Sequence, residues 1–290
     1  MSYLPLKKLY VDTRYKISGT NSNFRIELPE NITCESNTVI YLDDITIPNS
    51  FWCIENGVNN KLYFYLAPSS PGGVPSETIN KIVSITPGNY TPVDLAIEIQ
   101  QKMRDSLIAT VYNNNIFSTL YNSKTNTIQI SISLSGVNFK ILTPLDLKTK
   151  LNNTWSGSSY DASKPDDIND ILSNLEGNSA TYDSNNPFIS GYINMNSINE
   201  IYMCSSALGN FNNFGLGNIG TNVIKKIPVN ADKNQYVFDQ IILFNDFCDV
   251  SHRNLRTLDF QFKDVKGNII NFHGVNLSFS IIFSRNNPEN

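Results

Sequence analysis

The segment Asn276-Leu-Ser-Phe-Ser-Ile-Ile-Phe283 near the end of the chain decides the fold. Apolar residues recur at every second position from Leu277 to Phe283, and serines stand between the first three of them. Because successive side chains of a strand point to opposite faces, this spacing predicts a strand with one buried apolar face. The segment is therefore expected to form the last strand of a β-sandwich or barrel.

Similar patterns occur at both ends of the chain. In the first eighty residues we expect strands at 8–12, 24–28, 38–47 and 61–66, the second of them ended by Pro29. From residue 192 onward we expect strands at 199–204, 222–228, 235–244, 255–262 and 276–283. Neither block alone supplies the roughly eight strands of a double-sheet jelly roll, but the two together do.

The middle of the chain has a different character. Thr91-Pro-Val-Asp94 is typical of a helix start, with Thr at the N-cap and Pro in the first turn. Leu95, Ile99 and Met103 follow on one face of this helix. Strands are expected around it, at 82–85, 117–121, 127–134 and 139–142. Residues 143–190 are expected to be mostly coil, with helix starts at 143–144 and 163–165 and a short helix over 168–175.

These patterns predict a mainly β protein, a single jelly-roll β-sandwich with an inserted small α+β domain. We expect residues 1–80 to form the first part of the jelly roll and residues 191–290 the second part. Residues 81–190 are expected to form the inserted domain, which is close to the lower size limit for an independent core.

The composition excludes several classes of function. The chain has 22 Lys and Arg against 26 Asp and Glu, a net charge of −4, and only 17% charged residues. This balance argues against a protein that grips nucleic-acid phosphates. The 41 Asn residues indicate a polar surface built from amides rather than ions. The start of the sequence lacks the apolar region of a signal peptide, and no apolar run is long enough to span a bilayer, so we expect a soluble intracellular protein.

The residues that usually carry catalysis or bind metals are few. The chain has two histidines, His252 and His273, and four widely spaced cysteines. Cys248, Asp249 and His252 lie within five residues, but a metal site needs three or four ligands and no second cluster adjoins them. The cysteines are expected to be reduced, buried and inert. We predict no metal site and no cofactor.

One glycine motif and two pairs of adjacent acids are further candidates for a functional site. Gly215-Leu-Gly-Asn-Ile-Gly220 matches the dinucleotide pattern, but a strand-like run follows it where a helix N-terminus is needed. Asp43-Asp44 and Asp166-Asp167 are pairs of acids, and glycosidases use two carboxyl groups for catalysis. Adjacent residues of a strand point to opposite faces, so we expect that Asp43 and Asp44 cannot act together. In each pair, one acid is expected to be solvated and the other bonded to a turn.

The remaining signals also argue against an enzyme. The 16 Phe and 14 Tyr residues are expected mostly in a core or at an interface. Lys225-Lys226 and the pair Arg253 and Arg256 are too few for a nucleic-acid footprint. Since no residue set indicates a reaction, we predict a structural or binding protein with no catalytic residues.

Taken in order along the chain, several stretches resemble the penton (minor capsid) proteins of virophages and polinton-like viruses. Examples are Leu9-Tyr-Val-Asp-Thr-Arg14, Ile85-Thr-Pro-Gly-Asn-Tyr-Thr91 and Leu258-Asp-Phe-Gln-Phe262. Each motif is a weak strand pattern, and their order gives the resemblance its weight. The other stretches are 24–29, 39–52, 60–64, 139–143, 155–157, 168–172, 201–206, 226–229, 263–267 and 277–283.

The resemblance implies a viral capsid structural protein. It implies a homopentamer at the icosahedral vertices, held by trimers of a double-jelly-roll major capsid protein. Other minor capsid proteins or a host surface receptor are further partners, and host attachment is a role for the insert. The chain would then lie in the virion, with no specific nucleic-acid binding and no membrane span.

A second function class stays open at this point. A carbohydrate-binding or attachment module is also a non-catalytic jelly roll. It needs exposed aromatic side chains on one sheet face, which Trp52 and Trp155 supply only in part.

Overall fold

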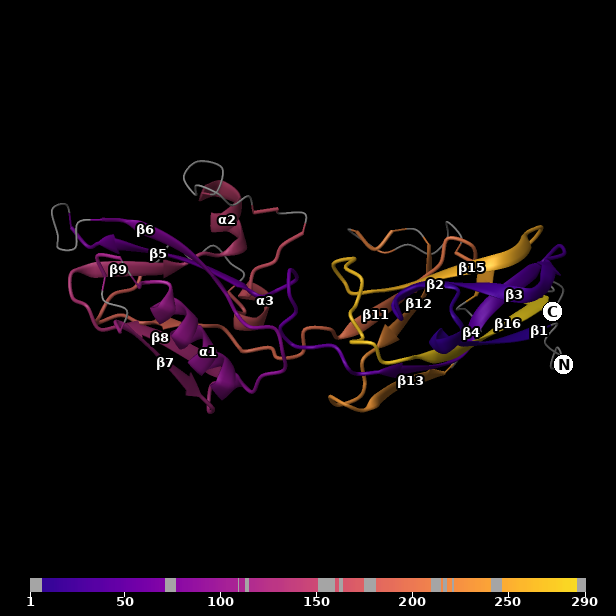
Figure 1. The fold of residues 1–290 in the computed structure, drawn as a ribbon, viewed down its shortest axis with the longest axis horizontal. Coiled ribbons are helices and arrows are strands. Elements are labelled where there is room, and N and C mark those ends of the chain that lie inside the picture. The colour runs from indigo at the N-terminus through magenta and orange to yellow at the C-terminus, as the bar shows by residue number, and fades with distance from the viewer. Residues whose placement is uncertain are drawn as a thin grey trace. The chain divides into compact units, whose positions relative to one another are not determined.

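The structure of this chain, a computed structural model, describes residues 7–70, 77–108, 110–112, 115–150, 160–161, 164–174, 181–209, 215, 218–220, 222–240 and 247–285. The chain divides into two compact units. The jelly-roll unit comprises Met1–Phe51 and Ile198–Asn290, and the inserted unit comprises Trp52–Ser197. Figure 1 shows that the indigo start and the yellow end of the chain belong to the same unit.

Two antiparallel sheets form the jelly-roll unit. The first has the order β1-β16-β4-β13, and the second has the order β12-β11-β15-β3-β2. The short strand β14 also pairs with β4. A 3-10 helix, Thr13–Tyr15, follows the first strand. The strands are β1 (Lys7–Asp12), β2 (Ser18–Gly19), β3 (Asn23–Thr33), β4 (Thr38–Pro48), β11 (Glu200–Cys204), β12 (Val223–Pro228), β13 (Tyr236–Gln240), β14 (Cys248–Asp249), β15 (Asn254–Lys263) and β16 (Ser278–Arg285).

The long strands pair as a jelly roll requires. In chain order, the first pairs with the last (β1 with β16), the second with the next to last (β3 with β15), and so on through β4 with β13 and β11 with β12. This nested pairing wraps the chain around one core and places neighbouring pairs in opposite sheets. It confirms the predicted single jelly roll, with the insert between β4 and β11.

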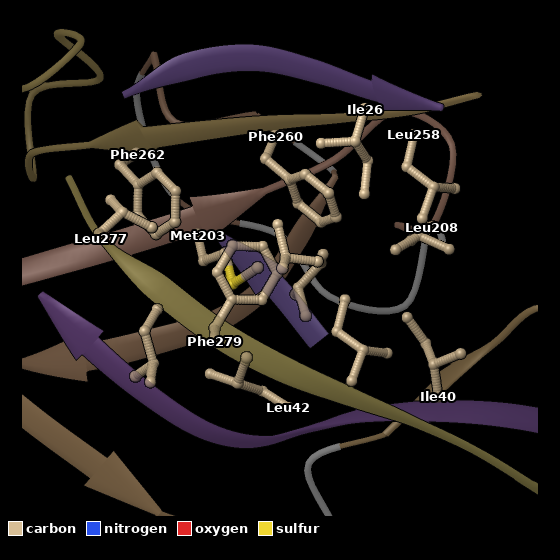
Figure 2. Packing of buried hydrophobic residues seen from close by; sticks show 14 of the residues in the cluster. Ile26, Ile40, Leu42, Met203, Leu208, Leu258, Phe260, Phe262, Leu277 and Phe279 are labelled. Carbon is tan, nitrogen blue, oxygen red and sulfur yellow. The ribbon is translucent and has the colours of Figure 1, made fainter. Parts of the chain in front are cut away.

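The inner faces of the two sheets bury a common aromatic core. Phe24 and Phe260 lie opposite each other on β3 and β15, with ring centroids 5.6 Å apart. Phe279 of the facing sheet packs edge-on against Phe260 at 4.9 Å. Figure 2 shows Phe260, Phe262 and Phe279 directed into the space between the sheets. Because these residues come from both ends of the chain, neither end can complete the core alone.

The expected strand at the end of the chain is confirmed as β16. Its residues Phe279, Ile281 and Phe283 are buried, as the alternation predicts. Ser280 and Ile282 are buried as well, so the middle of the strand is covered on both faces, where the alternation predicts a single buried face. The predicted end of the second strand at Pro29 is wrong, because β3 continues to Thr33. Strand β2 pairs with β3 only at Phe24 and Arg25, so β2 does not extend as far as Pro29. The missing N–H of Pro29 therefore breaks no hydrogen bond between β3 and β2.

The inserted unit contains two three-stranded sheets and three helices among its described residues. One sheet has the order β6-β5-β9 and the other β10-β8-β7. Their buried faces and one face of α1 share a core of their own. The elements are β5 (Lys61–Pro68), β6 (Ile79–Ser84), α1 (Pro92–Asp105), β7 (Phe117–Asn122), β8 (Thr127–Ile132), β9 (Val137–Ile141), α2 (Pro144–Lys150), α3 (Asn169–Leu172) and β10 (Phe188–Ile189).

Helix α1 forms as its sequence predicts. The Thr91 hydroxyl accepts a hydrogen bond from the Asp94 N–H at 3.2 Å, which satisfies one of the free donors of the first turn. Leu95, Ile99 and Met103 are completely buried. The cap and the apolar stripe together explain why this segment is a helix and which face it buries.

The expected domain boundaries at 80/81 and 190/191 differ from the observed division. Strand β5 pairs with β6 on one side and with β9 on the other, so residues 61–68 belong to the inserted unit. The alternation of this segment predicts a strand correctly. It does not say which sheet the strand joins, because hydrogen-bonded pairing is decided by contacts far along the chain.

The stretch expected to be mostly coil contains two of the expected helices. Helix α2 begins directly after Thr143, and α3 ends at Leu172, where Ser173 adopts a left-handed backbone conformation. The stretch around Trp155 and the expected helix end at Leu175 lie outside the described residues, as do parts of the features expected at 163–165 and 235–244. Among the described residues, no helix is long and apolar enough to cross a membrane.

Replacing Phe260 by alanine should lower the free energy of unfolding of the jelly-roll unit by about 3–5 kcal/mol, since it removes a fully buried ring from both sheets' core. Hydrogen exchange at the slowest amides of β15 and β4 measures this loss. Val265→Ala, at a position 61% exposed, is the control and should change stability by less than about 0.5 kcal/mol. If the amides of β8, which belongs to the inserted unit with its own core, lost the same free energy of protection, the division into two cores would be contradicted.

Candidate functional site

The cysteines and histidines do not form a reactive centre among the described residues. All four cysteines are buried, and none of them forms a disulfide. Burial raises the pKa of the Cys34 and Cys204 thiols, which lowers the fraction present as reactive thiolate. Within the described ranges, no three His, Cys, Asp or Glu side chains lie close enough to hold a metal ion.

The neighbours Cys248, Asp249 and His252 point in different directions. Cys248 is 1% exposed and belongs to the jelly-roll core, whereas Asp249 and His252 are exposed. The Asp249 carboxylate accepts a hydrogen bond from the Ser251 N–H at 2.8 Å, which closes the turn after β14. The strand alternation therefore separates the thiol from the other two candidate ligands.

The glycine motif lies between β11 and β12. The Gly215 N–H donates to the Gly220 carbonyl at 2.8 Å, and the next described element is β12, beginning at Val223. A strand therefore follows the motif where a dinucleotide site requires a helix N-terminus. Gly217 lies outside the described residues.

The prediction that Asp43 and Asp44 point to opposite faces is wrong. A β-bulge between β4 and β16 places Asp44 opposite Ser280 and Leu42 opposite Ile281, so Asp43 is the extra residue. The buried Ser280 hydroxyl lies 3.2 Å from Asp43 Oδ2 and 2.5 Å from Asp44 Oδ2. Both carboxylates therefore share one face.

A lysine from the edge strand completes this group. Lys8 of β1 forms an ion pair with Asp43, and its Nζ lies 3.9 Å from Asp44 Oδ2. The contacts thus join three neighbouring strands, β1, β16 and β4. Because the carboxylates are engaged by Lys8 and Ser280, the arrangement fastens the edge strand to the sheet.

The second acidic pair lies in the inserted unit, and both of its acids are bonded. Asp166 lies 2.5 Å from the Lys61 ammonium and accepts a hydrogen bond from the Tyr63 hydroxyl at 2.8 Å. Asp167 is 4% exposed and accepts a hydrogen bond from the Tyr160 hydroxyl at 2.6 Å. The prediction of one solvated acid is wrong for this pair, because β5 brings a cation and a phenol against Asp166.

This network holds the segment before α3 against β5. The Asn169 backbone and side chain both donate to Asp167 Oδ1, at 3.1 and 2.7 Å. The Tyr63 and Tyr160 rings pack edge to face, with centroids 5.9 Å apart. Burial, followed by the hydrogen bonds to the carboxylates, raises the pKa of both tyrosines well above its ordinary value. The group is a packed structural network.

The basic residues named in the sequence analysis are bonded to other groups of the same chain. Lys225 lies 3.5 Å from Asp239, and Lys226 lies 2.9 Å from Glu200. The Arg253 guanidinium donates to the carbonyls of residues 207 and 209, and Arg256 pairs with a glutamate of β3. They are spread over strands and loops and form no phosphate-binding row.

Exposed hydrophobic side chains lie at both edges of the first jelly-roll sheet, where Tyr10 of β1 and Tyr236 and Phe238 of β13 project from the same outer face. The β1 side, where β1 and β2 are the sheet edges, carries Tyr10, Tyr15 and Ile17 at 75%, 80% and 57% exposure. The β13 side, where β13 and β12 are the sheet edges, carries Tyr236 and Phe238 at 52% and 60%. These two sides are the candidate functional surfaces of this unit, because exposed aromatic side chains mark contact surfaces.

Sequence reasoning missed these residues. Tyr236, Val237 and Phe238 are all apolar, so their alternation does not reveal which of them face solvent. Only the burial of Val237 against the opposite sheet assigns the other two to the surface.

The inserted unit exposes a smaller apolar row. Leu120, Gln129 and Ile189 lie side by side across β7, β8 and β10, and the two aliphatic residues are 64% and 58% exposed. Trp52 is half-buried, and Trp155 lies outside the described residues. The described part of the chain therefore offers no exposed tryptophan that would stack on a sugar.

The comparisons with known proteins concern the fold. A crystal structure of the penton protein of mavirus is similar to this chain, with a TM-score of 0.52 and 9% sequence identity. The likeness covers 97% of this chain and all of the other one. No protein-family model matches the chain, and no curated protein matches its sequence. At this identity the two chains share a fold, including both units.

Alkaline titration should separate Tyr63 and Tyr160, whose hydroxyls are bonded to carboxylates, from the exposed tyrosines. Exposed phenols ionise near pH 10, whereas Tyr63 and Tyr160 should stay neutral until the inserted unit unfolds. Because their pKa is raised in the folded state, the stability that they contribute is present below pH ~10 and is lost as the pH rises further. Ultraviolet absorbance of phenolate measures the titration.

The variants Tyr63→Phe and Tyr160→Phe are the controls, since each should remove one late-ionising phenol and leave the early ones in place. Ionisation of all phenols in one early step, with the fold intact, would contradict the network.

Proposed function

We propose that this chain is a viral capsid structural protein, a penton or minor capsid protein. The observation that carries the proposal is the likeness to the mavirus penton protein along the entire chain, with the inserted unit included. The motif order in the sequence, which resembles that of virophage and polinton-like virus pentons, supports the same conclusion independently. The chain would act in the virion, at the vertices of the capsid.

The assembled form in this proposal is a homopentamer. A ring needs heterologous contacts, in which one surface of a protomer binds a different surface of the next. A surface with few charges lowers the desolvation cost of burying it in a permanent contact. The pentamer would be held in place by trimers of the major capsid protein.

The inserted unit is proposed to act in attachment to the host. It has its own core, so it can be displayed without disturbing the jelly roll. Its exposed row Leu120, Gln129 and Ile189 carries no charged side chain and is a candidate contact face. A host surface receptor or another minor capsid protein is the proposed partner. No catalytic role is proposed for either unit.

The oligomeric state tests the proposal directly. In mass photometry the purified chain should appear as five copies of 32.6 kDa, about 163 kDa, and electron microscopy should show five-fold particles. A chain that remains a monomer and binds glycans on an array would instead support the carbohydrate-binding class.

Removing the inserted unit tests its role. Replacing residues 52–197 by a short Gly-Ser linker should leave pentamers and particles intact and abolish adsorption to cells, because the deleted residues have a separate core. The shorter deletion of 82–190 does not test the role as well. It removes the second half of β6 and all of β9, so β5 would remain without its pairing strands. Unchanged adsorption by the variant particles would refute the attachment role.

A further inference from the structure

The outer face of the first jelly-roll sheet carries a row of polar side chains that crosses its strands. Asp12, Ser278 and Thr46 lie side by side on β1, β16 and β4, and Phe238 of β13 continues the row. The residues of the neighbouring row on β1, β16 and β4 are buried in the core. Because successive residues of a strand point to opposite faces, the polar row lies on the solvent side of the sheet.

A hollow of about 430 Å³ lies at this row and is open to solvent. Besides Asp12, Ser278 and Thr46, its lining includes the exposed side chains of Arg14 and Tyr236. The loop at 275–277, just before β16, forms the remaining wall. The volume is in the range that binding sites for small molecules have.

The two charged groups of the hollow neutralise each other. Arg14 Nε and Nη2 donate to the Asp12 carboxylate at 3.0 and 2.6 Å, which makes a bidentate ion pair. These hydrogen bonds lower the pKa of Asp12, so its carboxylate is ionised at neutral pH. An anion that entered the hollow would meet this carboxylate, and a cation would meet the guanidinium. The pair therefore favours a neutral molecule.

The other polar groups of the hollow are available to such a molecule. The hydroxyls of Thr46, Ser278 and Tyr236 have no hydrogen-bond partner among the described residues. Each hydroxyl can donate one hydrogen bond and accept others, as the hydroxyls of a sugar can. The Tyr236 ring, which is 52% exposed, adds an apolar surface beside them. The hollow thus combines one apolar face with several neutral hydrogen-bonding groups.

We propose that this hollow binds a neutral saccharide. A pyranose has a C–H face that packs on the Tyr236 ring, and its hydroxyls exchange hydrogen bonds with Thr46 and Ser278. The Asp12 and Arg14 pair supplies an acceptor and a donor for two further hydroxyls. A hydrocarbon in the same place would leave these polar groups unpaired. The inference does not rest on the proposed capsid function, and it assigns sugar binding to the jelly-roll unit.

Saturation-transfer NMR tests the binding, with the methyl glycosides of glucose, galactose, mannose, fucose and N-acetylglucosamine as probes. At least one probe should receive saturation at its ring C–H protons, since those protons face Tyr236. Titration of that probe should show binding about 10-fold weaker in Tyr236→Ser, the effect of losing one aromatic contact. Tyr15→Ser, in the same unit and 80% exposed but outside the hollow, is the matched control and should leave binding unchanged. Circular dichroism verifies that both variants are folded.

The charge balance of the hollow gives a second test. In the unchanged chain N-acetylneuraminate, a sugar that carries a carboxylate, should bind at least ~10-fold more weakly than the best neutral probe. Asp12→Asn keeps the size of the side chain but removes the charge that balances Arg14. This variant should therefore narrow or reverse the preference. A preference of the unchanged chain for N-acetylneuraminate would overturn the neutral class of ligand.

The outcomes separate this inference from the proposed function. No transfer to any of the five probes, or transfer that Tyr236→Ser leaves unchanged, overturns the saccharide site, and the penton proposal stands if the chain still forms five-membered rings. If the chain binds a probe through Tyr236 but stays monomeric, the site stands and the penton proposal is overturned. Five-membered rings that bind a probe through Tyr236 support both.

Discussion

Strand β16 pairs with β1 on one side and with β4 on the other, and the rest of the jelly-roll unit depends on this placement. This pairing places β16, the last strand of the chain, between β1 and β4, which are the first and the third of the long strands. Its buried ring, Phe279, then meets Phe260 and Phe262 of the facing sheet. Because the core is complete only when both ends of the chain have met, everything between β4 and β11 must leave the sandwich and return. The inserted unit lies in the connection between β4 and β11.

The same closure explains why chemistry is scarce in the described residues. The sandwich is filled by side chains, and the polar groups that stand out in the sequence are bonded to one another. Ser280 and Lys8 hold Asp43 and Asp44, and in the inserted unit two tyrosines hold Asp166 and Asp167. Each group joins strands or fixes a segment. Exposed aromatic side chains lie on the surface, on the edge strands β1 and β13.

The proposed capsid role needs stability and defined contacts rather than a reactive centre, and several features of this chain agree with that proposal. Its low charge lowers the cost of removing water from large surfaces. Its two separate cores allow the inserted unit to vary while the jelly roll keeps its contacts. Fold, composition and surface therefore agree with one another, although only the fold follows from the likeness to the mavirus penton protein.

The amino-acid sequence alone indicated most of the long strands, the cap of α1 and the presence of two β-rich ends, because alternation and capping are local properties of neighbouring residues. It did not determine that β5 belongs to the inserted unit, since a strand pattern carries no information about its partner. It also misplaced Asp43, because the bulge depends on the register with β16, more than two hundred residues away. Likewise, Tyr236 and Phe238 became surface residues only once Val237 had packed inward. Tertiary structure decided these points, because pairing and burial arise from contacts between distant segments.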